Sequence, residues 1–485
     1  MRTGDSHTHA TTIDSLPDNV LLEVFNFCRL KQQLYGFHFH SIWDWHKLAH
    51  ICLRWRHIIF SSPRRLDLQL LCTYGTPVRK NLSYWPPFPL IIDYSSYWRA
   101  EYSKSLTPID EDNVVTALED SARVHYIGIS VTGLFIGKMS TAMRKPFPAL
   151  THLRLSLKDG NMPALPDDFL GGSAPALQVF HLKGIGFPAL PMILSSAPSL
   201  VELRLLDIPH DGYISPEAMV TRLAALTELK ILFIGFKSPT RTSRKHHQDH
   251  VTRTVIPSLT TFEFHGIKEY LEDLIAQIDT PQLDYFRISY FNQLDFHIPQ
   301  LSKFVGRTQN LSLARFKRAR VDFGINNLDV GLYGEREELL ETHFSFQIPC
   351  RGLDWQVSHV AQILSQSGAM LSNVSDISID GRDIPPGRKD FMDDTVWLEI
   401  LRHFTAGETL HVAGNLAEHI ARGFEGATEK MVAEVMPSLL SLCLEPQDEP
   451  NAYVDRFVTI RQLSGRPVTI LDSPGGRDFF EGFTY

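Results

Sequence analysis

The chain has 485 residues, of which 43% are hydrophobic and 21% charged, so most of it should fold around apolar cores. Its formal net charge of -8 argues against a nucleic-acid surface as the main functional feature. The five cysteines are scattered and never form a Cys-x-x-Cys pair, which argues against a zinc module and favours a reducing compartment.

Residues 1–12 predict a disordered N-terminus. This segment lacks the apolar stretch of a secretory signal, and the chain nowhere approaches the run of about eighteen apolar residues that a membrane span needs. We therefore expect a soluble protein of the cytoplasm, the nucleus or both.

Residues 13–62 predict two or three short helices. The first begins near Ser15, a candidate N-cap, with Pro17 in its first turn and Asp18 where the helix dipole favours negative charge. Its apolar stripe leaves out Leu22 and contains Val20, Leu21, Val24, Phe25 and Cys28. A second helical period comprises Trp45, Leu48, Ile51, Cys52, Trp55 and Ile59. Helices this small cannot bury a core alone.

Two short motifs within these helices resemble an F-box: Leu16-Pro17 with Leu21-Leu22-Glu23-Val24-Phe25, and the later Cys52-Leu53-Arg54-Trp55-Arg56. In that family the F-box is a small helical module that binds the Skp adaptor of a cullin-based ubiquitin ligase, while the rest of the chain selects the substrate. The resemblance implies adaptor binding by Leu16, Pro17, Val20, Leu21, Leu22, Leu48, Ile51 and Trp55. The alternative is an amphipathic helical cap on the domain that follows.

Residues 63–145 are predicted to be a linker and the N-terminal cap of a repeat array. The aromatic residues Tyr84, Trp85, Phe88, Tyr94, Tyr97 and Trp98 lie here among prolines. Open arrays need caps, so we expect these side chains to seal one end, the alternative being an exposed binding platform. Segments 63–89 and 461–468 are similar to fungal F-box proteins that carry repeat-bearing tails.

Residues 146–445 predict an irregular solenoid with the Leu-x-x-Leu-x-Leu spacing of leucine-rich repeats. The units begin at Leu150, Leu177, Leu200, Leu226, Leu259, Leu283, Thr308, Val374 and Leu439. The last apolar positions alternate on a short strand, and neighbouring units must stack because one unit cannot cover its own apolar face. The expected fold is therefore α/β, a short helical F-box followed by this solenoid. The alternative is a compact α/β domain with coincidental leucine spacing.

Return helices are predicted over residues 215–223, 268–275, 355–364, 396–404 and 416–424. Residues 446–485 are predicted to be a C-terminal cap and tail, with a helix over 454–463 and a strand over 468–470.

Outward strand positions of the array are the candidate substrate contacts, because they form neighbouring rows on one sheet. They are His152, Arg154, His181, Glu202, Arg204, Lys230, Glu263 and Arg287, together with the loop 238–253. The alternative is an ordinary solvated face.

Two basic segments could carry other functions. His246, His247 and His250 beside Asp249 could bind a metal, although a flexible basic loop fits better. The run 315–320 is interpreted as a solvated face, the alternative being a nuclear-import signal or an acidic-ligand site.

No phosphate-binding, metalloprotease, nucleophile-elbow or dinucleotide motif occurs. We expect a non-catalytic protein without metal, cofactor, nucleic-acid or membrane partner. The sequence predicts a substrate-recognition subunit of a Skp–cullin–F-box ubiquitin ligase, which binds a Skp-type adaptor, through it a cullin, and an unidentified protein substrate. The alternative is a leucine-rich-repeat interaction scaffold without a ubiquitin-ligase role.

Overall fold

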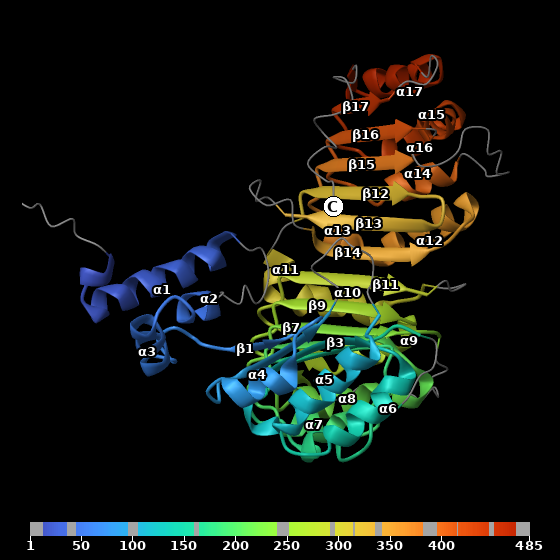
Figure 1. Cartoon of the computed structure of the whole chain (residues 1–485). Coiled ribbons are helices and arrows are strands. Elements are labelled where there is room, and N and C mark those ends of the chain that lie inside the picture. The colour runs from blue at the N-terminus through green and yellow to red at the C-terminus, as the bar shows by residue number, and fades with distance from the viewer. Residues whose placement is uncertain are drawn as a thin grey trace, which may run out of the picture. The chain divides into compact units, whose positions relative to one another are not determined.

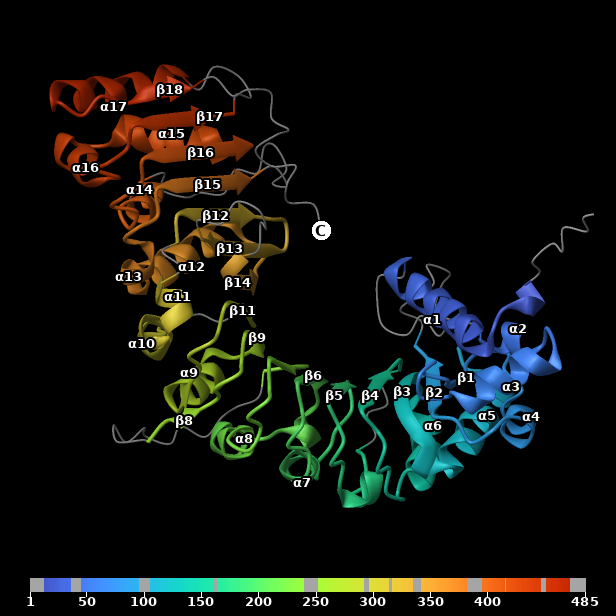
Figure 2. The ribbon, with the colours of Figure 1, turned by 90° about the vertical axis from the view of Figure 1, so that its left-hand side faces the viewer.

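The computed structural model describes residues 13–35, 45–95, 105–159, 164–239, 252–291, 296–313, 316–334, 342–381, 395–414, 416–445 and 451–471. The chain forms two compact units, drawn in Figures 1 and 2: Met1–Asp159 with Asp168–Ala174, and Gly160–Asp167 with Pro175–Tyr485.

The first unit combines short helices with a small sheet. Its elements are η1 (Ile13–Ser15), α1 (Asp18–Tyr35), α2 (Trp45–Ala49), α3 (Leu53–Ser61), β1 (Leu70–Cys72), α4 (Val78–Tyr84), β2 (Leu90–Tyr94), α5 (Pro108–Glu119), η3 (Ser121–Arg123), β3 (Val124–Val131), α6 (Gly133–Ala142), β4 (His152–Leu157) and η4 (Phe169–Gly172), where η denotes a 3-10 helix.

The start of α1 differs from the sequence prediction. Ser15 ends the 3-10 turn and α1 begins at Asp18, so Pro17 precedes the helix and its carbonyl accepts the amide of Leu21. Leu22 is buried with Leu21, so the predicted stripe that left it out is wrong.

The second helical period is also interrupted. It is split between α2 and α3, and the Cys52 sulfur accepts the amide of Trp55 as the N-cap of α3. An N-cap residue is not itself helical, so the apolar spacing across Cys52 does not belong to one continuous helix.

The strands of the first unit form a parallel sheet in the order β1-β2-β3-β4. The sheet therefore begins at Leu70, within the segment assigned above to linker and cap. Val124, Ile127 and Ile129 are buried at the repeat spacing along β3. The repeat pattern is present there with β-branched residues in place of leucine.

The second unit contains the longer sheet. Its elements are β5 (Val179–Lys183), α7 (Leu190–Ser195), β6 (Glu202–Ile208), η5 (His210–Gly212), α8 (Pro216–Leu223), β7 (Ile231–Phe236), β8 (Thr254–Val255), β9 (Thr261–Gly266), α9 (Lys268–Ala276), β10 (Ile278–Asp279), β11 (Tyr285–Tyr290), α10 (Pro299–Arg307), α11 (Gln309–Leu313), β12 (Arg318–Phe323), β13 (Asn327–Tyr333), β14 (Thr342–Pro349), α12 (Leu353–Gln366), α13 (Gly368–Leu371), β15 (Asp376–Gly381), α14 (Val396–Leu401), β16 (Thr409–Gly414), α15 (Leu416–Gly426), α16 (Glu429–Glu434), β17 (Ser441–Leu444), α17 (Asn451–Leu463) and β18 (Thr469–Leu471).

Strand order in this unit is β5-β6-β7-β9-β11-β14-β13-β12-β15-β16-β17-β18, and a separate parallel pair joins β8 to β10. Among the strands of the long sheet, β13 is antiparallel to both neighbours, and the other pairs are parallel. Helices α8, α9 and α10 lie along one face of the sheet (Figure 2). This is a mixed α/β array on a long parallel sheet, consistent with a leucine-rich-repeat-like solenoid.

Most repeat strands and return helices predicted in this unit are confirmed. The apolar pairs that begin at Phe180, Leu203, Phe262, Phe286, Ile377 and Leu442 lie inward on β5, β6, β9, β11, β15 and β17. The expected helices correspond to α8, α9, α12, α14, α15 and α17, and the strand near the C-terminus to β18.

Three repeat assignments need correction. The repeat predicted from Leu226 is three residues out of register, because the buried set is Leu229 before β7 with Leu232 and Ile234 on it. Residues 309–313 form α11 instead of a repeat strand, and the place beside β11 is taken by β14. The strand β16 was missed because Gly407 stands where the repeat expects leucine, and a Cβ there would lie 2.7 Å from both Ile377 and Met436.

None of the helices within the described ranges is long and apolar enough to cross a membrane.

Candidate interaction surfaces

The N-terminal helices have a small core of their own. Leu21, Phe25, Trp55 and Ile58 are buried, and the rings of Phe25 and Trp55 lie 4.9 Å apart. This contact packs α1 against α3, so the two helices form one module.

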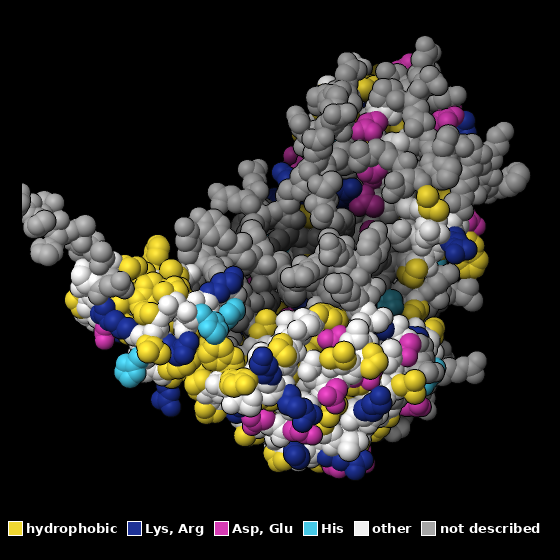
Figure 3. Space-filling view, viewed as in Figure 1, with side chains coloured by type: hydrophobic (Ala, Val, Ile, Leu, Met, Phe, Trp, Pro, Cys, Tyr) yellow, Lys and Arg dark blue, Asp and Glu magenta, His cyan; other side chains and the backbone are white. Residues whose placement is uncertain are grey.

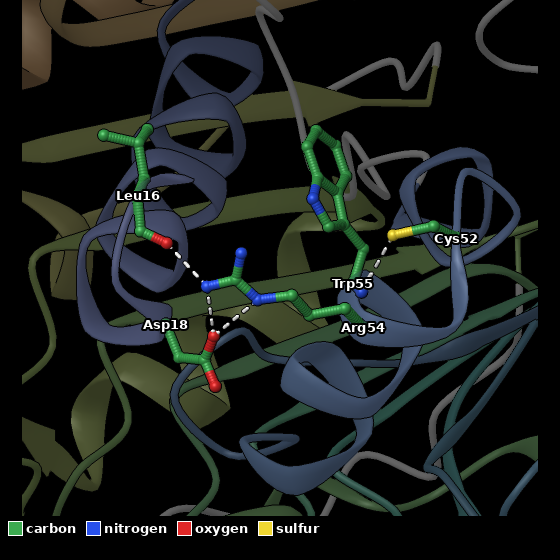
Figure 4. Close-up of polar contacts among 5 residues, drawn as sticks. All are labelled: Leu16, Asp18, Cys52, Arg54 and Trp55. Atoms are coloured by element: carbon green, nitrogen blue, oxygen red, sulfur yellow. Dashed lines mark hydrogen bonds and ion pairs between the residues drawn. The ribbon is translucent and has the colours of Figure 1, made fainter. Parts of the chain in front are cut away.

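Arg54 ties the start of α3 to the start of α1 (Figure 4). Its Nη2 donates to the Leu16 carbonyl at 2.5 Å, and its Nε donates to the Asp18 carboxylate at 2.8 Å. Because the guanidinium contacts a backbone and a side chain at once, it fixes the angle at which the chain enters α1.

Aromatic side chains join α2 to the segments that precede β1 and β2. The Trp45 indole donates to the Gln69 carbonyl at 2.9 Å, and its ring lies 5.2 Å from Trp85 and 5.5 Å from Phe88. Trp85 and Phe88 therefore pack against α2. Tyr84 is 74% exposed, so the prediction that it seals the array is wrong. Residues Tyr97 and Trp98 lie outside the described ranges.

The residues predicted to bind the adaptor fall into two groups. Leu21, Leu22 and Trp55 are buried, and Leu16 and Leu48 are half-buried. Pro17, Val20 and Ile51 are exposed. The buried group can hold the helices together, and the exposed group can contact another protein directly.

Three exposed apolar residues of this module were not among the predicted contacts. Val24 and Phe27 continue the line of Val20 along α1 at i+4 and i+7, and Leu53 begins α3. Phe27 is 66% exposed and Leu53 is 80% exposed. Hydrophobic side chains gather over α1 in Figure 3. The sequence signal for this surface is that α1 carries apolar residues on two sides, although packing against a core requires them on one side only. We call Val20, Val24, Phe27, Ile51 and Leu53 the helical patch.

The second candidate surface is one face of the long sheet. Strand register joins positions from successive strands into a single row, which we call the central row: His181, Arg204, Phe233, Glu263, Arg287, Ser345, Gly331, Arg320, Ser378 and His411. The row contains four of the predicted substrate contacts.

Glu202 is the centre of a cluster of polar contacts on this face. Its Oε1 lies 3.0 Å from His181 Nε2 and 2.6 Å from Arg204 Nε, and Arg204 also lies 4.0 Å from Glu263. Burial alone would raise the pKa of Glu202, but His181 and Arg204 outweigh it and lower the pKa to about 2.

Lys230 does not occupy the predicted outward strand position. It is exposed but precedes β7, and Phe233 stands in the central row instead. The three-residue register error described above is the reason.

His152 and Arg154 lie on β4 of the first unit. The His152 ring is 5.8 Å from the Tyr126 ring, and Arg154 hydrogen-bonds the Tyr126 side chain. Most of the predicted loop 238–253, including His246, His247 and His250, lies outside the described residues, as does Arg315.

A row of three aspartates was not predicted. Asp329 on β13 is paired with Asp322 on β12, and Asp322 is paired with Asp380 on β15. Arg320 lies 2.7 Å from Asp322 and 3.5 Å from Asp380. Arg320 therefore belongs to an ion-pair network, which corrects the solvated-face interpretation of this residue. The alternation of Val321 and Phe323 with Asp322 signals a strand here.

No group of three or more histidine, cysteine or acidic side chains in the described part of the chain is arranged to hold a metal ion.

Comparison with known proteins adds little to this picture. No family model matches the chain, and no curated protein matches it. Among solved structures, the chain is similar to the leucine-rich repeat-containing protein LegL7 from Legionella pneumophila, with 11% identity, a TM-score of 0.26 and coverage of 83% of this chain and 99% of that one. At this identity and TM-score the likeness carries no argument about function.

Proposed function

We propose that this chain is the substrate-recognition subunit of a Skp–cullin–F-box ubiquitin ligase. The observation that carries the proposal is the helical patch: a module whose core is already filled still exposes apolar side chains along α1, before α3 and at the start of α3. Exposed apolar surface of this kind is typical of a protein-binding site. The F-box-like motifs lie in the same helices, which supports a Skp-type adaptor as the partner.

The helical patch and the sheet face have separate roles in this proposal. The helical patch binds the adaptor and through it the cullin, and the sheet face of the repeat array binds a protein substrate. The chain supplies no chemistry of its own, since it acts by holding the substrate near a ubiquitin-loaded enzyme.

The test is capture of a Skp-type adaptor by the full chain in co-expression. Val24→Asp combined with Leu53→Asp places two charges on the helical patch without touching the module core, so capture should be lost while the melting temperature stays within about 2 °C of wild type. Leu134→Asp is the matched control, because Leu134 is an equally exposed leucine on α6, outside the patch.

Normal capture by the folded double variant would contradict the proposed interface. Failure of the wild-type chain to capture adaptor or cullin would contradict the ligase role and favour a repeat-based interaction scaffold. Leu21→Asp with Leu22→Asp is a poorer test, because both leucines are buried and their loss should unfold the module.

A further inference from the structure

The turn between α2 and α3 carries two exposed apolar side chains of the helical patch. Helix α2 ends at Ala49 and α3 begins at Leu53. Ile51 lies in the connection and is 58% exposed, and Leu53 is 80% exposed. Side chains that are held in one direction lose less freedom when a partner binds them. How firmly this turn is fixed therefore affects how tightly the patch can bind.

Arg56 holds the side of the turn that follows α2. Its Nε donates to the Ala49 carbonyl at 3.0 Å, so the fourth residue of α3 is tied back to the last residue of α2. The amide of Ile51 donates to the Leu48 carbonyl at 3.2 Å. Ile51 thus lies in a short loop of chain that a side-chain hydrogen bond closes at both ends.

Arg54 holds the side of the turn that leads into α3. The Cys52 sulfur first accepts the amide of Trp55, which caps the helix. The Arg54 Nη2 then donates to the Leu16 carbonyl at 2.5 Å and to Asp18 Oδ1 at 2.6 Å (Figure 4). The start of α3 is thereby tied to the start of α1.

These arginine contacts set a direction more than they stabilise the module. The side chains of Arg54 and Asp18 are 38% and 63% exposed, and ion pairs this exposed contribute little to folding. The buried core of Phe25, Trp55 and Ile58 already holds α1 against α3. Fixing the turn is the further effect that the two arginines supply.

We propose that Arg54 and Arg56 are positioning residues for adaptor binding, which hold Ile51 and Leu53 in the orientation that contacts the adaptor. This inference rests on the proposed function in one respect, that the adaptor is the partner of the helical patch. It gives separate roles to three neighbouring residues of the F-box-like motif. Trp55 packs in the module core, and the arginines on either side of it fix the turn.

The experiment uses the complex of the full chain with a co-expressed, fluorescently labelled Skp-type adaptor. Release of the label is followed after excess unlabelled adaptor is added. Arg54→Met and Arg56→Met should each raise the dissociation rate about tenfold, because the bound state must then order a turn that is no longer held. Arg65→Met is the matched control. It removes an exposed arginine whose ion pair joins Glu23 on α1, so the rate should change less than about twofold.

Two more variants separate positioning from direct contact and from stability. Asp18→Asn should also raise the rate, and its combination with Arg54→Met should dissociate no faster than Arg54→Met alone, because both changes remove one contact. Ile58→Val trims the module core but leaves both arginine contacts in place. It should lower the melting temperature and change the dissociation rate less than about twofold.

Hydrogen exchange of the full chain provides a readout without the adaptor. Residues 49–56 should exchange faster in Arg54→Met and Arg56→Met than in wild type or Arg65→Met, because the released turn opens more often.

Unchanged exchange in both variants would overturn the inference. Normal capture with an unchanged dissociation rate in Arg54→Met would overturn it and leave the proposed function standing. Equal acceleration by Ile58→Val would also overturn it, since loss of stability would then explain the rate. Additive rates for Arg54→Met and Asp18→Asn would show direct contact with the adaptor instead of positioning. Failure of the wild-type chain to capture adaptor would overturn the proposed function and this inference together.

Discussion

At the scale of single residues, carboxylates on one sheet face have opposite effects on stability. Glu202 has a folded pKa of about 2 against an ordinary value of 4.5, so its charge stabilises the fold above pH 4.5, and that contribution is lost as the pH falls toward 2. Asp322 has a folded pKa of about 6 against 3.8, so its charge lowers stability above pH 6, and the loss is recovered as the pH falls toward 3.8.

Replacing Glu202 tests the first statement. Glu202→Gln keeps the shape but removes the charge that His181 and Arg204 compensate, so the free energy of unfolding at pH 7 should fall by about 3 kcal/mol. The difference from wild type should shrink between pH 4.5 and pH 2. Urea denaturation at pH 7 and at pH 3 measures both values. Glu228→Gln, at an exposed position, is the control, and equal denaturation midpoints for Glu202→Gln and wild type would contradict the prediction.

At the scale of elements, arginines bind backbone carbonyls in or just before several strands. Arg123 donates to the Phe88 carbonyl, Arg307 to the Ile278 carbonyl, and Arg461 to the Leu439 carbonyl, each at 3.0 Å. Each bond ties a backbone turn to a side chain from a later part of the chain. The planar guanidinium suits this role because it carries several donors in a fixed geometry.

Arg461 offers the sharpest test, because its side chain is only 1% exposed. Arg461→Met should lower the free energy of unfolding by about 1–3 kcal/mol, because it removes the Nη2 donor to the Pro437 and Leu439 carbonyls. Arg456→Met, at an exposed position on the same helix α17, should change it by less than about 0.5 kcal/mol. Thermal melting measures both, and equal effects would show that the buried donor contributes no stability of its own.

Most strands and helices of the repeat array could be predicted from the sequence. Periodic leucines predicted most strands and return helices, because inward positions on stacked strands must be apolar. The register failed at β7 because Leu226, Leu229 and Leu232 repeat every three residues and satisfy the pattern twice. The row of three aspartates, Asp329, Asp322 and Asp380, was not predictable either, since it depends on the reversed strand β13, and cross-strand neighbours of a reversed strand do not follow from repeat spacing.

At the scale of the whole molecule, the helical patch should govern behaviour in solution. Exposed apolar surface promotes association, so the chain expressed alone should aggregate, and co-expression with a Skp-type adaptor should raise the yield of monodisperse protein. Val24→Asp with Leu53→Asp should improve monodispersity without the adaptor. Size-exclusion chromatography measures all three preparations. Equal monodispersity in all three preparations would contradict the prediction that the helical patch causes aggregation.

The reversed strand β13 also has a consequence for synthesis on the ribosome. Stacked repeats can fold one after another, each on the repeat before it. The neighbour of β11 is β14, although β12 and β13 come earlier in the chain, and β12 lies beside β15. The strands β12 and β13, each with an apolar side chain at every second position, therefore cannot join the sheet beside β11 until Pro349 has emerged from the ribosome. We expect elongation to carry its greatest risk of misfolding between residues 318 and 349, where the array cannot grow in order.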